Sequence, residues 1–431
     1  MVGLRKFGAV LLVLTLIAAG CSSGEEDLIA EASDDTGEVE DAEPSTEPTP
    51  GVDTPSTTAF EQPEDDDPAG SAETVAPDPT DCTAGQRLGS RVDVRQDGNR
   101  ISDTQINLAE ATVIDIEVPG TPIWILAEPT RPGEWYVALD DGSAVRVGLD
   151  SVSDADAPES LPPLIDPEGI VSGYFDDHAL FANPLFDGRV VESEGLFVVL
   201  SEPTDRLDHG VLGDAIEAAA IEWVDSCDET SGTIEIAEPD VIEGISPIIA
   251  DVDDDGAPEI VVTLSNSSDG ARLAAFELDG SVTGESEPIG RGNRWRNQLA
   301  AGPFGPDGQT EIVDIRTPHI GGTVQAFELI DGSLELVAAS DARYTTHEIG
   351  SRNLDMGIAI DASADGQLDA VVATSDLSAL VALTRTGDGW TIVAERGIDG
   401  RLTTNIAVQS TSDGQTQLAV GAPGKIRVWT G

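Results

Sequence analysis

The chain has 431 residues, with 81 acidic and 22 basic side chains and a formal net charge of -59. So negative a protein repels phosphate backbones, which excludes nucleic acid as a general partner. The three cysteines are too few for a disulfide-rich scaffold, and no Cys/His cluster has the spacing of a zinc site.

The first 20 residues read as an export signal. Arg5 and Lys6 precede a short apolar core over 9–19, and small residues precede Cys21. This ending resembles a bacterial lipobox, which implies that Cys21 becomes the lipidated first residue of the mature protein. An ordinary signal peptide is the alternative. We therefore expect an exported lipoprotein that is anchored to the cell membrane and faces outside the cytoplasm.

Residues 21–81 are expected to be a disordered tether. Positions 22–81 hold 20 acidic residues, 8 prolines and no basic residue. Such a segment buries too little apolar surface to offset the entropy lost on folding. Charge repulsion and proline should extend it, so that the folded domain stands away from the membrane.

The folded domain is expected to span residues 82–431. If Cys21 carries lipid, Cys82 and Cys227 remain as a pair in an oxidising compartment. The sequence therefore favours a disulfide between Cys82 and Cys227, with two buried thiols as the alternative.

The first half of this domain has the pattern of short β-strands. Apolar and β-branched runs predict strands; they lie at 123–126, 135–139, 144–147, 196–200 and 218–224. Asp140-Asp141-Gly142 predicts a hairpin turn between the second and third of these runs. Residues 210–217 fit either a helical turn or a loop that leads into a strand, and we favour the loop.

An oxygen-rich loop opens the second half of the domain. Asp251, Asp253 and Asp255 alternate along it, Gly256 permits a sharp turn, and Glu259 is the ninth residue. Carboxylates at this spacing, with help from the carbonyl of Ala257, are ligands that calcium prefers. A β-branched run follows at once, so the loop leads into a strand rather than into the second helix of an EF-hand. Turn chemistry without a metal is the alternative, since Asp-Gly is a favoured turn pair.

The loop recurs three times downstream. The second copy keeps oxygen side chains at its first, third, fifth and ninth positions, namely Asp361, Ser363, Asp365 and Asp369. Two further copies keep Asp307-Gly308 and Asp413-Gly414 but lose most of the other ligands. The four glycines lie 52, 58 and 48 residues apart, a period typical of propeller blades.

These repeats resemble the FG-GAP or VCBS-type repeats of integrin-like β-propellers, most clearly over residues 240–431. The resemblance implies an all-β fold of about seven four-stranded blades, with six as the alternative, and structural calcium in the first two loops. The last blade lacks one strand, and the alternating residues 91–95 are predicted to supply it and to close the ring.

Arginines recur before the predicted inner strands, at Arg294, Arg352 and Arg401, with Arg291 and Arg296 near the first. Equivalent positions of a propeller form a ring, so these side chains should gather near one mouth of the channel. They either clamp acidic residues of neighbouring blades or bind an anionic ligand. His347 and His319 are expected on the same rim.

No local catalytic motif is present: the sequence has no nucleophile elbow, no His-Glu-x-x-His and no phosphate-binding loop. We assign no catalytic residue and expect a calcium-supported binding or interaction module. Its ligand would be an anionic small molecule, a glycan or a protein. A hydrolase or lyase acting at the arginine-lined mouth is one alternative, and a passive surface protein is another.

Overall fold

The structure is a computed structural model that describes residues 97–128, 131–155, 178–292 and 294–431. Strands dominate these residues, and a short 3-10 helix, η1, spans Pro318–Ile320. The predicted signal peptide, the tether, Cys21 and Cys82 lie outside the described residues. Within the described ranges, no helix has the length and apolar character needed to cross a membrane.

The described strands form five sheets. Three of them have four strands. The first contains β3 (Pro122–Ala127), β4 (Glu134–Leu139), β5 (Ala144–Gly148) and β6 (Ser151–Asp154). The second contains β16 (Arg296–Gly302), β17 (Glu311–Arg316), β18 (Thr323–Ile330) and β19 (Ser333–Ala339). The third contains β2 (Thr112–Glu117), β25 (Ala407–Ser410), β26 (Thr416–Ala422) and β27 (Lys425–Thr430).

The two larger sheets have six and nine strands. The six-stranded sheet contains β1 (Ile101–Gln105), β20 (Tyr344–Thr345), β21 (Gly357–Asp361), β22 (Asp369–Thr374), β23 (Ala379–Thr386) and β24 (Gly389–Gly397). The nine-stranded sheet contains β7 (Val191–Ser193), β8 (Leu196–Thr204), β9 (Glu217–Asp225), β10 (Thr230–Glu235), β11 (Val241–Ile242), β12 (Ile248–Ala250), β13 (Glu259–Asn266), β14 (Gly270–Phe276) and β15 (Val282–Glu285).

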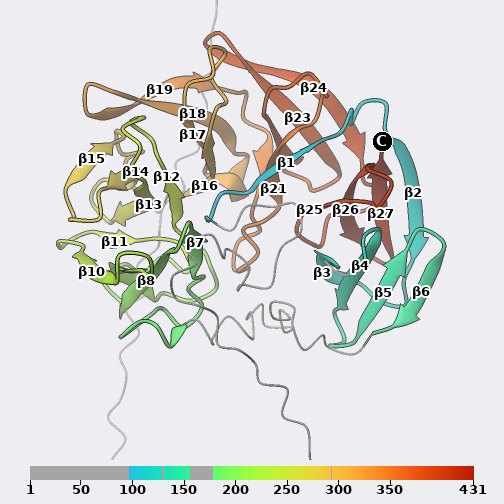
Figure 1. Ribbon diagram of the computed structural model, residues 1–431, viewed down its shortest axis with the longest axis horizontal. Helices are drawn as coiled ribbons and strands as arrows, with labels where there is room; N and C mark the ends of the chain where they lie inside the picture. Colours follow the sequence, from blue (N-terminus) through green and yellow to red (C-terminus); the bar gives the residue numbers. More distant parts are fainter. Residues whose placement is uncertain (1–96, 129–130, 156–177, 293) are drawn as a thin grey trace, which may run out of the picture. The chain divides into compact units, whose positions relative to one another are not determined.

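The hydrophobic core lies between successive sheets. One cluster joins the sheet of β21–β23 to the sheet of β25–β27, and another joins it to the sheet of β16–β18. Further clusters join β12–β14 to β16–β18, and β25–β27 to β3–β5. Figure 1 shows the sheets following one another in chain order. Core clusters cover both faces of β13 and of β26, so these two inner strands are buried throughout.

The two ends of the described domain are held in the sheets of its second half. β2 pairs antiparallel with β27, the last strand of the chain, from Thr112↔Thr430 to Glu117↔Lys425; Figure 1 shows the two strands side by side. β1 pairs in parallel with β21. The prediction that residues 91–95 supply the closing strand was therefore wrong, although closure by a strand from the N-terminal end was right. Residues 91–95 lie outside the described residues, and β2 alternates apolar and polar residues only over its last four positions, 114–117.

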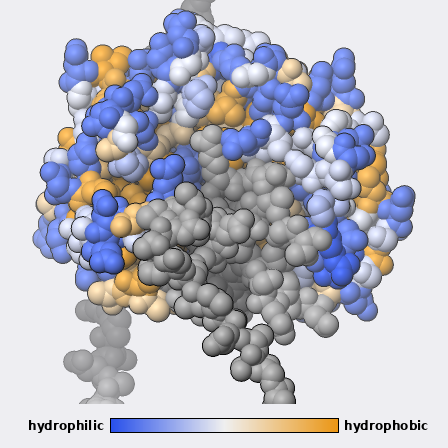
Figure 2. Space-filling model, in the orientation of Figure 1, coloured by the Kyte–Doolittle hydropathy of each residue, from blue (hydrophilic) through white to orange (hydrophobic). Residues whose placement is uncertain are grey.

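The prediction of an all-β fold is confirmed for the described residues, and the succession of packed sheets is typical of a β-propeller. The five predicted strands of the first half correspond to β3, β4, β5, β8 and β9. Residues 210–216 form turns that lead into β9, as the loop interpretation expects. On the face seen in Figure 2, hydrophilic and hydrophobic residues are interspersed around the rim.

Candidate functional site

The first acidic loop brings three carboxylates together between β12 and β13. Oxygen atoms of Asp251, Asp253 and Glu259 all lie within 4.8 Å of one another. The backbone makes this possible through left-handed conformations at Asp254, with φ 60°, and at Gly256, with φ 92°. The backbone N–H of Gly256 donates to Asp251 Oδ2 at 3.0 Å, and that of Val252 donates to Glu259 Oε2 at 2.7 Å. The loop therefore orients each of these two carboxylates with a hydrogen bond to one oxygen.

The other two oxygens of these carboxylates have no donor. Asp251 Oδ1 and Glu259 Oε1 are buried and make no hydrogen bond within the described structure. The pKa of Glu259 is raised to about 7, first by burial and then by repulsion from Asp253, Glu277 and Asp251, while the hydrogen bond from Val252 opposes the rise. The site thus holds closely spaced negative charge with unsatisfied oxygens, which a hard cation would neutralise.

Asp255 and Ala257 take part in the turn. Asp255 Oδ1 accepts the N–H of Ala257 at 2.7 Å, and the N–H of Asp255 donates to Asp253 Oδ1 at 3.0 Å. Asp255 is not among the three clustered carboxylates. Of the five predicted ligands, the structure therefore brings together Asp251, Asp253 and Glu259.

The second loop has the same backbone but a more satisfied set of oxygens. Ala364 and Gly366 have φ 58° and 92°, and the N–H of Gly366 donates to Asp361 Oδ2 at 2.9 Å. Asp369 Oδ2 accepts the N–H of Ala362 at 2.9 Å, and the hydroxyl of Thr384 donates to Asp369 Oδ1.

The two other predicted ligands of the second loop are Asp365 and Ser363. Asp365 Oδ1 accepts the N–H of Gln367 at 3.0 Å, and Ser363 Oγ is buried without a partner in the described residues. Burial raises the pKa of Asp369, and the hydroxyl of Thr384 opposes that rise. In the part of the chain that the structure describes, the first loop supplies the only group of three or more potential metal-ligating side chains.

In the two degenerate copies, protein side chains pair with the ninth residue of the loop. In the third copy, the ninth residue, Glu311, receives two hydrogen bonds of 3.0 Å from the guanidinium of Arg385 on β23. In the fourth copy, the amide of Gln409 donates to Gln417 Oε1 at 3.0 Å, which joins the first and ninth positions directly. The ninth position thus has a positive or neutral hydrogen-bonding partner wherever the acidic ligands are missing.

Three of the five predicted ligand-binding arginines are paired with acidic residues. Arg296 donates to Asp314 Oδ2 at 2.7 Å, and Arg401 forms two hydrogen bonds with Glu348, of 3.0 and 2.9 Å. Arg352 donates to Asp187 Oδ2 at 2.6 Å and also to Asp214. Arg291 and Arg294 are exposed and donate to backbone carbonyl oxygens of Ser268 and Ile289. These contacts are the ones expected if the arginines clamp neighbouring segments.

Two histidines, His347 and His319, pack against Trp295. The ring of His347 meets Trp295 edge-on at 4.9 Å, and His319 stacks on Trp295 at 6.5 Å. His347 Nε2 lies 2.7 Å from the carbonyl oxygen of Ser351 and must donate to it, so its Nδ1 is an acceptor. Burial lowers the pKa of His347 to about 4 and also lowers that of His319. Both rings are therefore neutral at physiological pH.

A pair of buried acids, Glu243 and Glu217, lies near a third histidine, His209. Glu243 contacts His209 Nδ1 through Oε1, and its backbone carbonyl accepts the indole N–H of Trp295 at 2.8 Å. Burial, together with repulsion from Glu243, Asp214 and Asp187, raises the pKa of Glu217 to about 10. Glu217 is therefore protonated at neutral pH.

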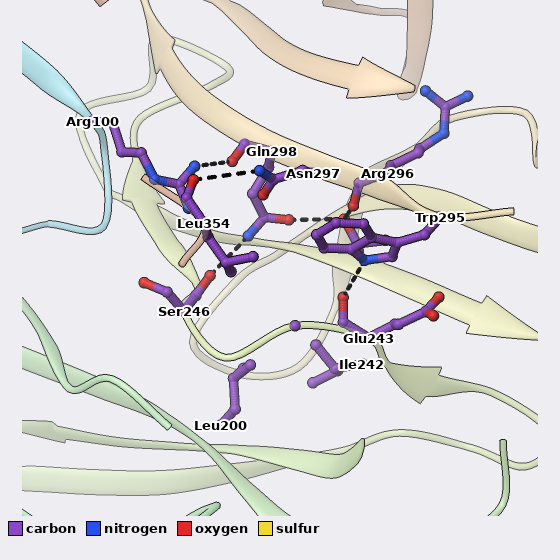
Figure 3. A pocket seen from close by; sticks show the side chains of 12 residues that line it. Arg100, Leu200, Ile242, Glu243, Ser246, Trp295, Arg296, Asn297, Gln298 and Leu354 are labelled. Carbon is purple, nitrogen blue, oxygen red and sulfur yellow. Dashed lines mark hydrogen bonds between the residues drawn. The ribbon is translucent and has the colours of Figure 1, made fainter. Parts of the chain in front are cut away.

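A small cavity lies beside this group, and Figure 3 shows Trp295, Glu243, Arg296 and Arg100 among its lining residues. Its volume is about 10 Å³, which is enough for about one water molecule. Gln298 donates to the carbonyl oxygen of Ser246 at 3.0 Å, and Arg100 donates to that of Gln298, across the cavity wall. Such a cavity has no room for an organic substrate.

Cys227 lies in a turn after β9, where its Sγ contacts the carbonyl oxygen of Glu194 at 3.4 Å. Because Cys82 is outside the described residues, the disulfide stays a prediction.

Comparisons with known proteins add little to this description. A scan against models of protein families finds no match, and a search of curated proteins also finds none. The FG-GAP or VCBS resemblance therefore stays a hypothesis that rests on the repeated loops.

Solved structures give distant similarities only. A quinohemoprotein alcohol dehydrogenase from Pseudomonas putida HK5 is 10% identical, with TM-score 0.32, over 78% of this chain and 58% of that one. An auxiliary nutrient binding protein from Bacteroides thetaiotaomicron is 9% identical, with TM-score 0.32, over 72% and 69%. A glucose dehydrogenase is 12% identical, with TM-score 0.33, over 74% and 99%. The chain thus spans less than two thirds of the first of these proteins, and similarities this distant carry no functional inference.

Proposed function

We propose that the protein is a membrane-anchored, extracytoplasmic β-propeller that binds calcium at the first acidic loop and acts as a ligand-binding or interaction module. The observation that supports calcium most directly is the cluster of Asp251, Asp253 and Glu259, with two buried oxygens that have no donor in the described residues. The two degenerate loops also support calcium binding in the first loop, because in them Arg385 or Gln409 is the hydrogen-bonding partner of the ninth residue.

We also infer that the propeller has six blades. The nine-stranded sheet is joined between β9 and β11 by a single residue pair, Ile242↔Ala218. Dividing it there gives two units, β7–β10 and β11–β15, beside the four other sheets. The sequence favoured seven blades because that number came from dividing the length of the folded domain by the repeat period.

Calcium binding can be tested by thermal unfolding. Calcium should raise the melting temperature of the full-length protein, with about 2.7 kcal/mol of stabilisation at a hundredfold excess over the dissociation constant. Asp253→Ala should remove most of this gain. Asp307→Ala, in the third copy, is the matched control and should retain it. Magnesium should substitute poorly because it demands tighter octahedral geometry. Identical melting in calcium and in chelator would contradict the proposal.

The lipid anchor has its own test. Mass spectrometry of the native protein should find a diacylglyceryl group on Cys21, and Cys21→Ser should release the protein from membranes.

A second candidate function, an extracytoplasmic hydrolase or lyase, is favoured by the acid and base groups near Arg352. Asp187 and Asp214, which pair with Arg352, are also the acids that raise the pKa of Glu217, and Glu243 contacts His209. A protonated carboxyl, a carboxylate and an imidazole in one place can serve general acid–base catalysis. The water-sized cavity beside Glu243 favours the binding function over this one.

A further inference from the structure

Three sheets converge on one buried group of side chains near the inner ends of their strands. Arg189 precedes β7, and Asp355 precedes β21, which pairs with β1. Arg189 Nη1 donates to Asp355 Oδ1 at 2.8 Å, and Arg100 Nε donates to the same oxygen at 2.8 Å. Trp124 on β3 also lies close, with its ring centroid 6.0 Å from the guanidinium carbon of Arg189. None of these residues was singled out from the sequence.

The guanidinium of Arg189 is incompletely satisfied. Arg189 is only 6% exposed, and its Nε and Nη2 are buried with no hydrogen-bond partner among the residues described. These two nitrogens form one edge of the planar group, and their N–H bonds point the same way. That edge matches the two oxygens of a carboxylate. Nη1 is meanwhile held by Asp355, and the Trp124 ring limits how the group can turn.

We propose that the Nε and Nη2 edge of Arg189 binds the carboxylate of a small organic acid, beside Trp124. This inference deepens the proposed function by naming a ligand class and a site for it, and it rests on the protein being a ligand-binding module. A carboxylate fits because it accepts two parallel hydrogen bonds, and because charged hydrogen bonds are strong away from water. The ligand must be small, since the guanidinium is almost fully buried.

The test uses the full-length protein in saturating calcium, with benzoate and acetate as probes. Chloride keeps the ionic strength constant, and benzamide is the uncharged analogue of benzoate. Benzoate or acetate should raise the melting temperature in a saturable way, whereas benzamide should not. Arg189→Lys can keep the contact with Asp355 but lacks the two-donor edge, so it should weaken the response at least tenfold. Arg343→Gln removes an exposed arginine that pairs with Glu395 and should leave the response unchanged.

A second measurement needs no variant, so it tests the proposal even if Arg189→Lys fails to fold. Crystals of the unaltered protein soaked in 4-bromobenzoate should show the anomalous signal of bromine beside Arg189 and Trp124. The proposal is overturned if neither acid raises the melting temperature, if Arg189→Lys responds as the unaltered protein does, or if bromine binds only elsewhere. A calcium shift that persists in any of these cases leaves the proposed calcium-supported module standing. Binding that ignores Arg189 would overturn this site alone.

Discussion

Arg385 on β23 and Glu311 on β17 form a buried ion pair with two hydrogen bonds, each 3.0 Å long. Their side chains are 4% and 2% exposed, and they join the six-stranded sheet to its four-stranded neighbour. The pair occupies the third copy of the acidic loop, where Glu311 has the ninth position. An arginine from an adjacent sheet thus does there what a cation is proposed to do in the first copy.

Removing one partner of this pair should be costly. Arg385→Met should lower the free energy of unfolding by about 3–5 kcal/mol, because it leaves the Glu311 carboxylate buried without its cation. Replacing both residues, as in Arg385→Met with Glu311→Leu, should recover most of that loss. Arg401→Met is the control, since its pair with Glu348 is exposed and should be worth about 1 kcal/mol or less. Urea unfolding at fixed calcium would measure all three, and equal losses for Arg385→Met and Arg401→Met would contradict the argument.

The buried carboxyl of Glu217 should make stability depend on pH. Its pKa rises from the ordinary 4.5 to about 10 in the folded protein, so the folded state binds one more proton than the unfolded state between these values. Stability from this group is therefore complete below about pH 4.5 and falls as pH rises towards 10, with a slope of up to about 1.4 kcal/mol per pH unit.

Glu217→Gln should remove this slope, because the amide cannot ionise. Unfolding by urea at several pH values between 6 and 9 would compare the two proteins. The matched control is Glu235→Gln on β10, an exposed position, which should keep the original slope. Parallel curves for Glu217→Gln and the unaltered protein would show that Glu217 does not carry the effect.

The closing strand β2 should contribute to stability mainly through its inward face. Ile116 is buried against the core beneath β27, whereas Val113 on the same strand is 39% exposed. Ile116→Ala should cost about 2–5 kcal/mol, as expected for a buried isoleucine. Val113→Ala should change stability by about 0.5 kcal/mol or less. Thermal melting of both variants would decide whether β2 seals the sheet or only lies on its edge.

The pairing of Cys82 with Cys227 is a further prediction, and it rests on the proposed export of the protein. Non-reducing peptide mapping should recover a peptide in which Cys82 is joined to Cys227, and reduction should lower stability by a few kcal/mol. Free thiols at both positions in the native protein would refute it.

The acidic loops were predictable because their parts are close in sequence. Asp251, Asp253 and Glu259 lie within nine residues, and the left-handed turn they need is signalled by Gly256. Arg385 and Glu311 are 74 residues apart, and Arg189 and Asp355 are 166 apart. No local pattern reports which distant partners the sheets will bring together, so these pairs and the Trp295 cluster could not be assigned beforehand.

The closing strand could not be predicted from the sequence for a different reason. Residues 91–95 alternate polar and apolar side chains throughout, whereas 112–117 alternate only over 114–117, and periodicity alone cannot say which of these two runs meets a given edge. The choice depends on the whole path of the chain.

The pairing of β2 with β27 joins residues that are more than 300 positions apart, such as Thr112 and Thr430. Forming such a contact costs loop-closure entropy before it contributes any favourable packing energy. Topologies rich in these contacts therefore fold slowly. The last sheet cannot be completed until the C-terminal strand β27 has been synthesised. Until then β26 has an open edge, which is a template for pairing with other chains. A chain that is cut short before Lys425 should therefore aggregate rather than accumulate as a smaller folded domain.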